Sequence, residues 1–474
     1  MSFYQINLAI FTACNAGLLC QQYRRDRQLP KTVEEALEAT PTHIEETGTS
    51  PSSSRRDVRK FVNDFFPVYA FAVAADWLQG PYIYAIYRYE KDLSEKMVAA
   101  LYAAGFVAGA VSASFAGRLA DRYGRRLACL VYCGVYTVTC LTMLSNNLVV
   151  LLAGRVAGGV ATTLLFSVFE AWMITEYHHR GLDEDTDVPG PALRLSSVFG
   201  YMTTLSCVVA IVSGIIGDAL VASLGGRIWP FMASISCCAI AACLIATSWD
   251  ENYGAKSVGG NALEDIRSGT AAIAEDKRIL ALGVASCFFE GAMYLFIFFW
   301  SAALKSARAH SSSSPWAIAA ADEDLPYGLV FSSFMCAMMA GSSLFSALTP
   351  VHTQESAAHV LTTAILVASA CLGGAAVLTD ERVLFWTLCA VEAAIGLYFP
   401  SMSFLKSEIV EDGVRGRVYS ILRCPLNAFV VLVHSLDEEG DDHRSQVFLA
   451  LAALLLSAFV IIRLNFKTAP SFDH

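Results

Sequence analysis

The stretch Gly117-Arg-Leu-Ala-Asp-Arg-Tyr-Gly-Arg-Arg126 lies between two long apolar segments and holds two glycines, one aspartate and four arginines. Segments this close in the chain must be joined by a short turn. We expect Gly117 and Gly124 to permit close packing and positive φ, and Asp121 to accept hydrogen bonds from backbone amides at a helix start. Arginine-rich loops stay on the cytosolic side of a membrane. The stretch therefore predicts a tight cytosolic turn between two membrane helices.

The composition around this turn is that of a membrane protein. Of the 474 residues, 55% are hydrophobic and 16% are charged, and the mean hydropathy is +0.49. Soluble domains carry about 25% charged residues, so a large soluble enzyme is excluded. The net charge of -10 argues against a nucleic-acid partner.

Thirteen apolar runs are each long enough to cross the roughly 30 Å hydrocarbon core of a bilayer. They lie at about 3–22, 61–87, 97–119, 127–146, 148–177, 194–222, 229–248, 278–304, 328–349, 357–378, 381–405, 415–437 and 444–466. Their spacing predicts an all-α membrane protein with two six-helix halves, which together hold twelve core spans, and one extra N-terminal span.

The predicted organisation follows from the polar stretches between the runs. It comprises an N-terminal anchor at 1–22, a cytosolic linker at 23–60, a six-helix half at 61–249, a cytosolic central loop at 250–277, a second half at 278–467 and a cytosolic tail at 468–474. The first run has no basic residue before it and no small-x-small cleavage site, which favours a retained helix over a cleaved signal peptide.

The basic residues set the predicted topology. If 23–60 is cytosolic, then 23 of the 33 Lys and Arg residues lie in cytosolic segments and 8 in the opposite loops. This bias predicts an N-terminus outside and a C-terminus in the cytosol. The two basic residues that remain, Arg155 and Arg423, fall within spans.

Four ionisable residues lie near the centres of predicted spans: Asp76, Glu290, Glu392 and Arg423. Counted along their helices, all four fall within roughly 5 Å of one plane. Charges at this depth are costly and usually face a cavity or a partner, and transporters bind their substrates there. Each also has a structural interpretation, such as a helix cap, a bridge between helices or a Glu392–Arg423 ion pair.

Other candidates lie around this plane. Arg155 is displaced outward, where outer packing is the alternative, and Glu170 is displaced inward, where a wet carboxylate is ordinary. Asn427 shares a helix face with Arg423, and an interhelical hydrogen bond would explain it equally well.

Two helix breaks are predicted beside buried charges. Gly80-Pro81 follows Asp76, and Pro425 follows Arg423. Tyr82 and Tyr84 continue outward from the first break and could face a substrate or form an interfacial belt.

The opening stretch resembles the signature G-x-L-a-D-r-x-G-r-r of the major facilitator superfamily, at the position where that superfamily places it. Gly154-Arg155-Val-Ala-Gly158-Gly159 is similar to the superfamily's fourth helix. The resemblance implies a cytosolic gate formed by Gly117, Asp121, Arg122, Gly124 and Arg125. Glu176 is a possible ionic partner for it, or a solvated interface residue. The corresponding stretch of the second half, 346–353, lacks the signature.

Five segments, together with 423–427 and the extra N-terminal helix, resemble the eukaryotic molybdate-anion transporter family. The segments are Ala75-Asp-Trp-Leu-Gln-Gly-Pro-Tyr-Ile-Tyr84, Leu165-Phe-Ser-Val-Phe-Glu-Ala-Trp172, Phe331-Ser-Ser-Phe-Met335, Gly341-Ser-Ser343 and Gly396-Leu-Tyr-Phe-Pro-Ser-Met-Ser-Phe-Leu405. The chain departs from the family at Ile409-Val-Glu411, where a proline is expected, and in 310–324.

The resemblance implies high-affinity-type import of the molybdate oxyanion across the plasma membrane by alternating access. Arg423, Arg155, Asn427, Tyr82 and Tyr84 would bind the dianion. Four carboxylates would pair with arginine or carry the protons of a symport, namely Asp76, Glu290, Glu392 and Glu170.

Other functions remain open from the sequence. The three acids Asp76, Glu290 and Glu392 outnumber Arg155 and Arg423, so charge alone would suit a cation or a proton. Transport of a sulfate-like oxyanion and a non-transporting sensor or scaffold are further alternatives. We expect no enzyme activity and no metal, because no HExxH, GxSxG or zinc-spaced Cys/His motif occurs in any span. We also expect no cofactor, and a monomer.

Overall fold

The computed structural model describes residues 2–38, 51–182, 195–254, 262–311, 324–349, 353–411, 414–435 and 440–466. The described residues form helices joined by short connections, as the thirteen apolar runs predict. The long helices are α1 (Phe3–Glu38), α2 (Pro51–Gln79), α4 (Glu95–Ala113), α6 (Arg125–Thr142), α7 (Leu148–His179), α8 (Leu195–Leu224), α9 (Trp229–Ser248), α11 (Lys277–Ser311), α13 (Tyr327–Leu348), α14 (Gln354–Ala375), α15 (Glu381–Ile409), α16 (Arg415–Ser435) and α17 (Asp441–Phe466).

Ten of these helices are long and apolar enough to cross a membrane. The other three, α2, α6 and α16, correspond to predicted spans, and each carries charged residues, which in α6 are its first two residues. Each packs on helices of the bundle: α2 on α8 and α9, α6 on α7 and α9, and α16 on α4 and α11.

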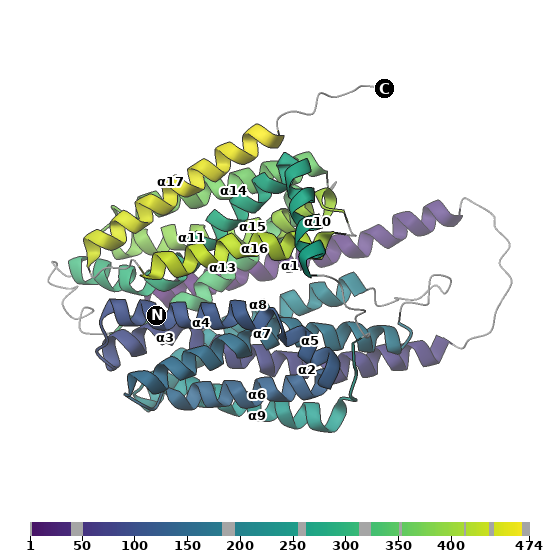
Figure 1. Ribbon diagram of the computed structural model, residues 1–474, viewed down its shortest axis with the longest axis horizontal. Coiled ribbons are helices and arrows are strands. Elements are labelled where there is room, and N and C mark those ends of the chain that lie inside the picture. The colour runs from purple at the N-terminus through teal and green to yellow at the C-terminus, as the bar shows by residue number, and fades with distance from the viewer. Residues whose placement is uncertain are drawn as a thin grey trace.

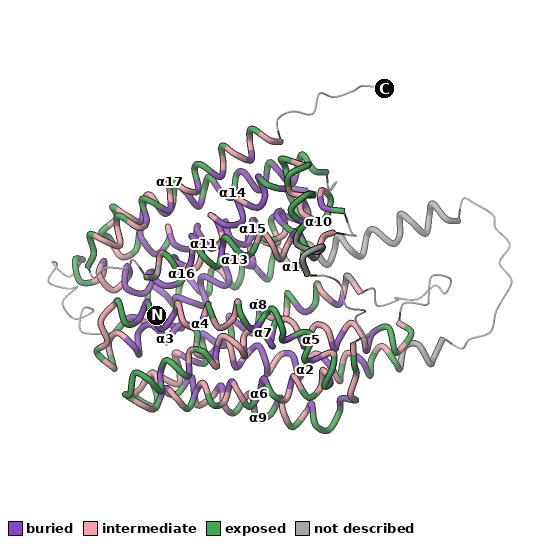
Figure 2. The backbone as a smooth tube through the Cα atoms, in the orientation of Figure 1, coloured by how far each residue is buried: buried purple, intermediate pink, exposed green. Residues whose placement is uncertain are grey.

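Two groups of helices make up the bundle (Figure 1). Helices α2 to α9 form the N-terminal half and α11 to α17 the C-terminal half. The halves meet where α8 packs on α13 and where α4 packs on α16. Buried residues follow the facing sides of the helices in each half (Figure 2).

We call the end of the bundle that carries the short helix α5 (Ala116–Tyr123) the motif end, and the opposite end the far end. Several helices begin at the far end, and polar residues cap them where the apolar runs start. Asn147 accepts from Val149 N of α7 at 2.9 Å, and Asp380 accepts from Arg382 N and Val383 N of α15 at 2.9 Å each. These caps satisfy amides that have no partner within the helix.

The extra helix α1 packs on α13 of the C-terminal half (Figure 1). Asn15 Nδ2 donates to the Cys336 carbonyl at 2.9 Å. The Tyr4 hydroxyl donates to Glu381 Oε1, which also pairs with Arg308 at 2.8 Å. Polar contacts of this kind fix a helix in an apolar setting more specifically than apolar packing does.

Both long polar stretches of the predicted organisation contain helices. Helix α1 continues beyond residue 22 to Glu38, and α2 begins at Pro51, so much of the predicted linker is helical. The predicted central loop contains α10 (Ala262–Glu275), which packs on α16. Charged, helix-favouring residues in these stretches support helices without an apolar run.

The two predicted helix breaks have different outcomes. After Gln79, α2 gives way to a 3₁₀ turn at Gly80–Tyr82, the short helix α3 (Ile83–Ala85) and a π turn at Ile86–Glu90, as predicted. The second prediction is wrong, because α16 continues through Pro425 to Ser435. A proline can stay inside a membrane helix when neighbours satisfy the freed carbonyl.

Candidate functional site

The first candidate site is a polar cluster around Asp76 in the N-terminal half. Tyr136 of α6 donates its hydroxyl to Asp76 Oδ1 at 3.0 Å. Gln79, one turn after Asp76, donates to the Tyr136 hydroxyl at 2.7 Å. The Arg155 guanidinium lies close enough to attract the Asp76 carboxylate. Asp76 is thus held between a neutral donor and a positive charge.

Arg155 itself lies against α4. Its guanidinium stands over the Tyr102 ring at 5.1 Å, and Nε lies 3.5 Å from the Leu101 carbonyl. At Gly105, a Cβ would come within 3.1 Å of Arg155 Nη2, so the glycine makes room for the guanidinium. Neither contact neutralises the charge of Arg155.

The second candidate site is a hydrogen-bonded chain around Glu290 in the C-terminal half. Glu290 Oε1 accepts from the Ser286 hydroxyl at 2.7 Å and from the Tyr398 hydroxyl at 3.0 Å. Lys406 Nζ donates to Ser286 Oγ at 3.1 Å. The two half-buried carboxylates Asp76 and Glu290 therefore each accept a hydroxyl hydrogen bond from a tyrosine, as expected for related positions in the two halves.

Arg423 is exposed on α16 and belongs to the second site. Its charge acts on Lys406 and on Tyr294 of α11. Asn427, one turn further, is exposed on the same helix. Arg423 thus acts on the Glu290 chain from α16, and no described contact joins Asn427 to that chain.

The structure does not pair Glu392 with Arg423. Glu392 is 5% exposed on α15 and lies beside Cys389, and no ion pair joins it to a basic residue within the described ranges. Glu170 lies beside Tyr69 of α2 and joins neither site. The structural interpretation of Glu392 and Arg423 as an ion pair is therefore wrong.

Tyr82 and Tyr84 lie at the boundary between the halves, toward the far end. The Tyr82 ring is 6.4 Å from that of Tyr327. The Tyr84 hydroxyl donates to Glu95 Oε1 at 2.9 Å, and its ring packs on Phe298 at 5.3 Å. These contacts join the N-terminal half to α11 and α13, and they place both tyrosines apart from the contacts of Asp76.

Charged residues also join the halves at the far end. Arg227, between α8 and α9, pairs with Glu90 at 2.9 Å and with Asp324, which precedes α13. Lys305 of α11 stands over the Tyr89 ring at 3.5 Å. The far end is thus held together by ion pairs and ring contacts that cross from one half to the other.

At the motif end, Asp121 and Arg125 form an ion pair with each other, with Arg125 Nη2 2.7 Å from Asp121 Oδ1. Arg125 Nη1 also donates to the Ala171 carbonyl of α7 at 2.9 Å and contacts Thr175. Arg122 is exposed. The pair therefore fastens α5 and α6 to α7.

Two expectations for the motif are wrong. Asp121 lies inside α5 and does not cap a helix, since Glu251 accepts from Arg126 N at 2.8 Å and from Leu127 N at 3.1 Å at the start of α6. Gly117 is helical with open space around it, whereas Gly124 has the predicted positive φ, 114°. The sequence offered no signal for Glu251, because it is 125 residues away from Arg126.

Glu176 does not pair with this motif. It is 6% exposed and pairs with Arg180 at 2.8 Å, and Arg180 also pairs with Asp64 of α2 at 2.8 Å. Both predicted roles, ionic partner of the motif and solvated residue, are therefore wrong. Glu176 instead belongs to an ion-pair triad that joins α2 to α7.

We predict opposite effects on stability for alanine at the two motif glycines. A Cβ at Gly124 would lie 2.4 Å from the Glu251 carboxyl carbon, and the positive φ adds strain. Together with the loss of the Glu251 cap, Gly124→Ala should lower the free energy of unfolding by about 2–3 kcal/mol. Gly117→Ala should keep or raise it, since alanine favours the helix. Thermal melting of the purified proteins in detergent checks both, and equal shifts would contradict the prediction.

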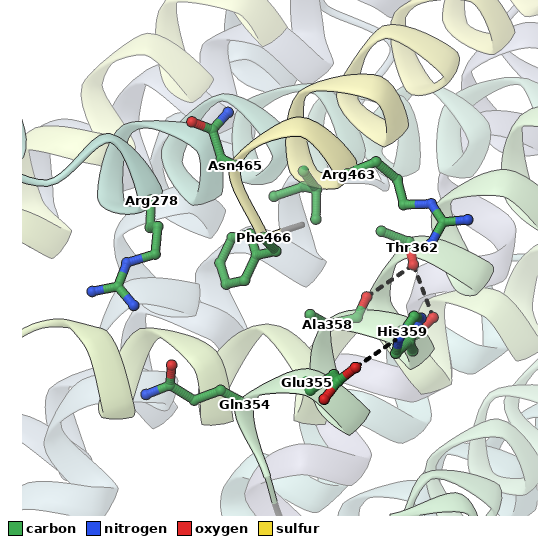
Figure 3. Close-up of a pocket in the computed structure, with 10 residues that line it drawn as sticks. Arg278, Gln354, Glu355, Ala358, His359, Thr362, Arg463, Asn465 and Phe466 are labelled. Atoms are coloured by element: carbon green, nitrogen blue, oxygen red, sulfur yellow. Dashed lines mark hydrogen bonds and ion pairs between the residues drawn. The ribbon is translucent and has the colours of Figure 1, made fainter. Parts of the chain in front are cut away.

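A separate pocket of about 510 Å³ lies between the start of α14, the end of α17 and the start of α11 (Figure 3). Arg278 and Arg463 are among its lining residues, and His359 faces Glu355 across 3.7 Å. It includes none of the residues predicted from the sequence. The pocket is lined by one carboxylate, that of Glu355, and by no residue of either candidate site.

Lys406 is the most important site residue that the sequence analysis missed. It falls one residue beyond the apolar run 381–405 and so counted as a loop residue, but α15 extends to Ile409. Ser286, Tyr136 and Tyr398 were missed because a single hydroxyl in an apolar run has no distinguishing signal. The spacing of Ser286 and Glu290, one helical turn apart, was the available clue.

Comparisons with known proteins agree with this architecture. A family profile described as sugar transporters with 12 TM matches residues 36–396. The solved nucleoside transporter NupG superposes with a TM-score of 0.62 at 13% identity, over 86% of this chain and 100% of NupG, and a mutant of NupG with a TM-score of 0.65 at 12% identity, over 85% and 100%. The bundle of membrane-spanning helices and the family profile together identify a multi-pass transporter of the major facilitator type.

Curated relatives give the family within this class. The molybdate-anion transporter of Xenopus tropicalis is 31% identical over 440 residues, which is 90% of this chain and 91% of the relative. That of Danio rerio is 31% identical over 467 residues, or 90% and 92%. The chain belongs to the molybdate-anion transporter family.

Proposed function

We propose that this protein imports molybdate by alternating access, with the motif end in the cytosol, and that protons drive the import across the plasma membrane. The observation that carries the proposal is the family relationship over 90% of the chain to relatives named molybdate-anion transporters. The basic bias of the loops supports the orientation.

The charges of the two candidate sites suit an oxyanion. Within the described residues, no carboxylate oxygen lies within the 4.0 Å ion-pair distance of Arg155, Lys406 or Arg423. Guanidinium groups bind tetrahedral oxyanions through paired N–H donors, and hydroxyl and amide groups complete the shell. We also propose Asn427, Tyr82 and Tyr84 as hydrogen-bond donors to the oxyanion in conformations in which the two halves have moved relative to each other.

Alternating access requires contacts that close one end of the bundle at a time. The ion pairs of Arg227 and the ring contacts of Tyr82 and Tyr84 are suited to closing the far end. The Asp121–Arg125 pair is suited to controlling the motif end. Movement of the two halves about the central sites would open one set while the other forms.

Uptake by the purified protein in lipid vesicles tests the function. Labelled molybdate should accumulate inside vesicles, and an inward proton gradient should increase the initial rate. Excess unlabelled sulfate should compete weakly if the site is specific for molybdate. Sulfate uptake in preference to molybdate would identify a different oxyanion, and cation uptake or no uptake would overturn the proposal.

Proton coupling predicts a change in pH dependence when the proton carrier is neutralised. Asp76 and Glu290 are the candidates, because each is a half-buried carboxylate at a matching place in the first helix of its half. Asp76→Asn should make uptake independent of external pH between about 5 and 8, since the amide cannot take up a proton. Initial rates measured across this range check the result. A variant that keeps the wild-type dependence on acidity excludes its residue as the carrier.

A further inference from the structure

Lys406 is directed toward the interior of the bundle. It lies three residues before the end of α15, so its backbone is about 5 Å from that helix end. Its Nζ nevertheless contacts Ser286, nine residues into α11 and about 14 Å from the start of that helix. Lysines near membrane helix ends usually extend their ammonium groups to the water. The Lys406 side chain instead extends its ammonium group toward the interior of the bundle.

The contact that Lys406 gains does not neutralise it. Ser286 is a neutral acceptor, and its own hydrogen goes to Glu290. The Tyr419 ring lies under the ammonium at 5.8 Å, and the charges of Glu290, which attracts Lys406, and of Arg423, which repels it, both act on the ammonium. No carboxylate in the described ranges, Glu290 included, lies within ion-pair distance of Lys406. An ammonium and a guanidinium without direct ion-pair partners can both donate charge-assisted hydrogen bonds to an anion.

Resting on the transport function proposed above, we propose that Lys406, with Arg423, binds the transported tetrahedral oxyanion beside the Ser286 hydroxyl. The charge of Arg423 acts on Lys406 and on Tyr294, and the charge of Glu290 acts on Lys406, Tyr294, Tyr398 and Cys287. Lys406 of α15 and Arg423 of α16 each carry one positive charge, and a dianion bound between them would offset both.

The hydrogen-bond directions support this assignment. Lys406 donates to Ser286, and Ser286 donates to Glu290. An ammonium group has three N–H donors, so Lys406 keeps donors for an oxyanion beside the one that Ser286 accepts.

Two variants of Lys406 and one control variant of another lysine test the proposal. Lys406→Gln keeps a hydrogen-bond donor for Ser286 but removes the charge, Lys406→Arg keeps the charge, and Lys277→Met removes an exposed lysine at the start of α11. The proteins are reconstituted in phosphatidylcholine nanodiscs, and melting is followed while sodium molybdate is added. Wild type and Lys277→Met should be stabilised by molybdate, and Lys406→Arg should retain most of the effect. Lys406→Gln should need at least tenfold more molybdate for the same stabilisation.

The outcomes separate the possible failures. If wild type is not stabilised by molybdate and transports none, the proposed function fails, and the inference fails with it. If wild type responds and Lys406→Gln responds within twofold of it, only the inference is overturned. Repeating the titration with phosphatidylglycerol tests a lipid phosphate as the occupant. If Lys406→Gln keeps its molybdate response but loses a stabilisation that this lipid gives wild type, the ammonium binds lipid and the proposal is overturned.

Discussion

Molybdate uptake by an Arg155→Ala protein is expected to fall at least about thirtyfold below that of wild type. The guanidinium is half-buried, stands over the Tyr102 ring and attracts Asp76 without forming a direct ion pair. Removing one member of a desolvated charge pair costs about 2–5 kcal/mol, and each 1.4 kcal/mol is a factor of ten in affinity. The initial rate of uptake in vesicles, at several molybdate concentrations, measures the loss.

Two further variants separate charge from packing. Arg155→Lys keeps the positive charge but loses the paired donors, and we expect an intermediate rate. Arg463→Ala removes a guanidinium that also stands over a ring, that of Phe459 at 5.7 Å, at the rim of the separate pocket, and should leave uptake close to wild type. Wild-type uptake by Arg155→Ala would remove Arg155 from the binding site.

Loss of Arg180 is expected to produce the largest change in stability. Arg180 pairs with both Asp64 and Glu176, and all three side chains are less than one fifth exposed. Arg180→Met leaves two carboxylates facing each other without a cation. We expect the free energy of unfolding to fall by about 3–5 kcal/mol, the range found when one partner of a buried ion pair is removed. Thermal melting in detergent measures the change.

A compensated variant provides the control for this triad. Combining Arg180→Met with Asp64→Asn and Glu176→Gln removes all three charges, and replacing a whole buried ion group is often nearly neutral. The triple variant should therefore recover most of the lost stability. If it melts as low as Arg180→Met, the loss comes from packing, such as the contact of Arg180 with the Phe61 ring at 5.8 Å, and not from unpaired charge.

The residues at the span centres show how far the sequence analysis reached. Asp76 and Glu290 were identified from their positions near the centres of the predicted spans. In the structure each carboxylate accepts a hydroxyl hydrogen bond within a polar cluster. The same reasoning joined Glu392 to Arg423, which are both central but are not brought together. Depth along a helix is predictable, whereas the direction of a side chain around that helix depends on its neighbours.

The motif shows the same limit at shorter range. The signature identified Asp121 and Arg125 as gate residues, and their pairing across adjoining helices joins residues only four apart in the chain. The cap of α6 was not, because Glu251 comes from the segment after α9. Glu176 was assigned to the motif because it lies at the same end, but the nearer cation in space is Arg180.

The sequence by itself determined the class of the protein, the succession of helical spans, the place of the motif and the break after Gln79. These features depend on the local composition of the chain, and a run of apolar residues partitions into a bilayer whatever its partners are. The tertiary structure alone decided which charges are paired and which are not. Attraction between charges depends on their separation in space, and the fold brings Glu176 within ion-pair distance of Arg180. The fold also places Lys406 beside Ser286 and within reach of the Arg423 charge, with no carboxylate at ion-pair distance in the described chain.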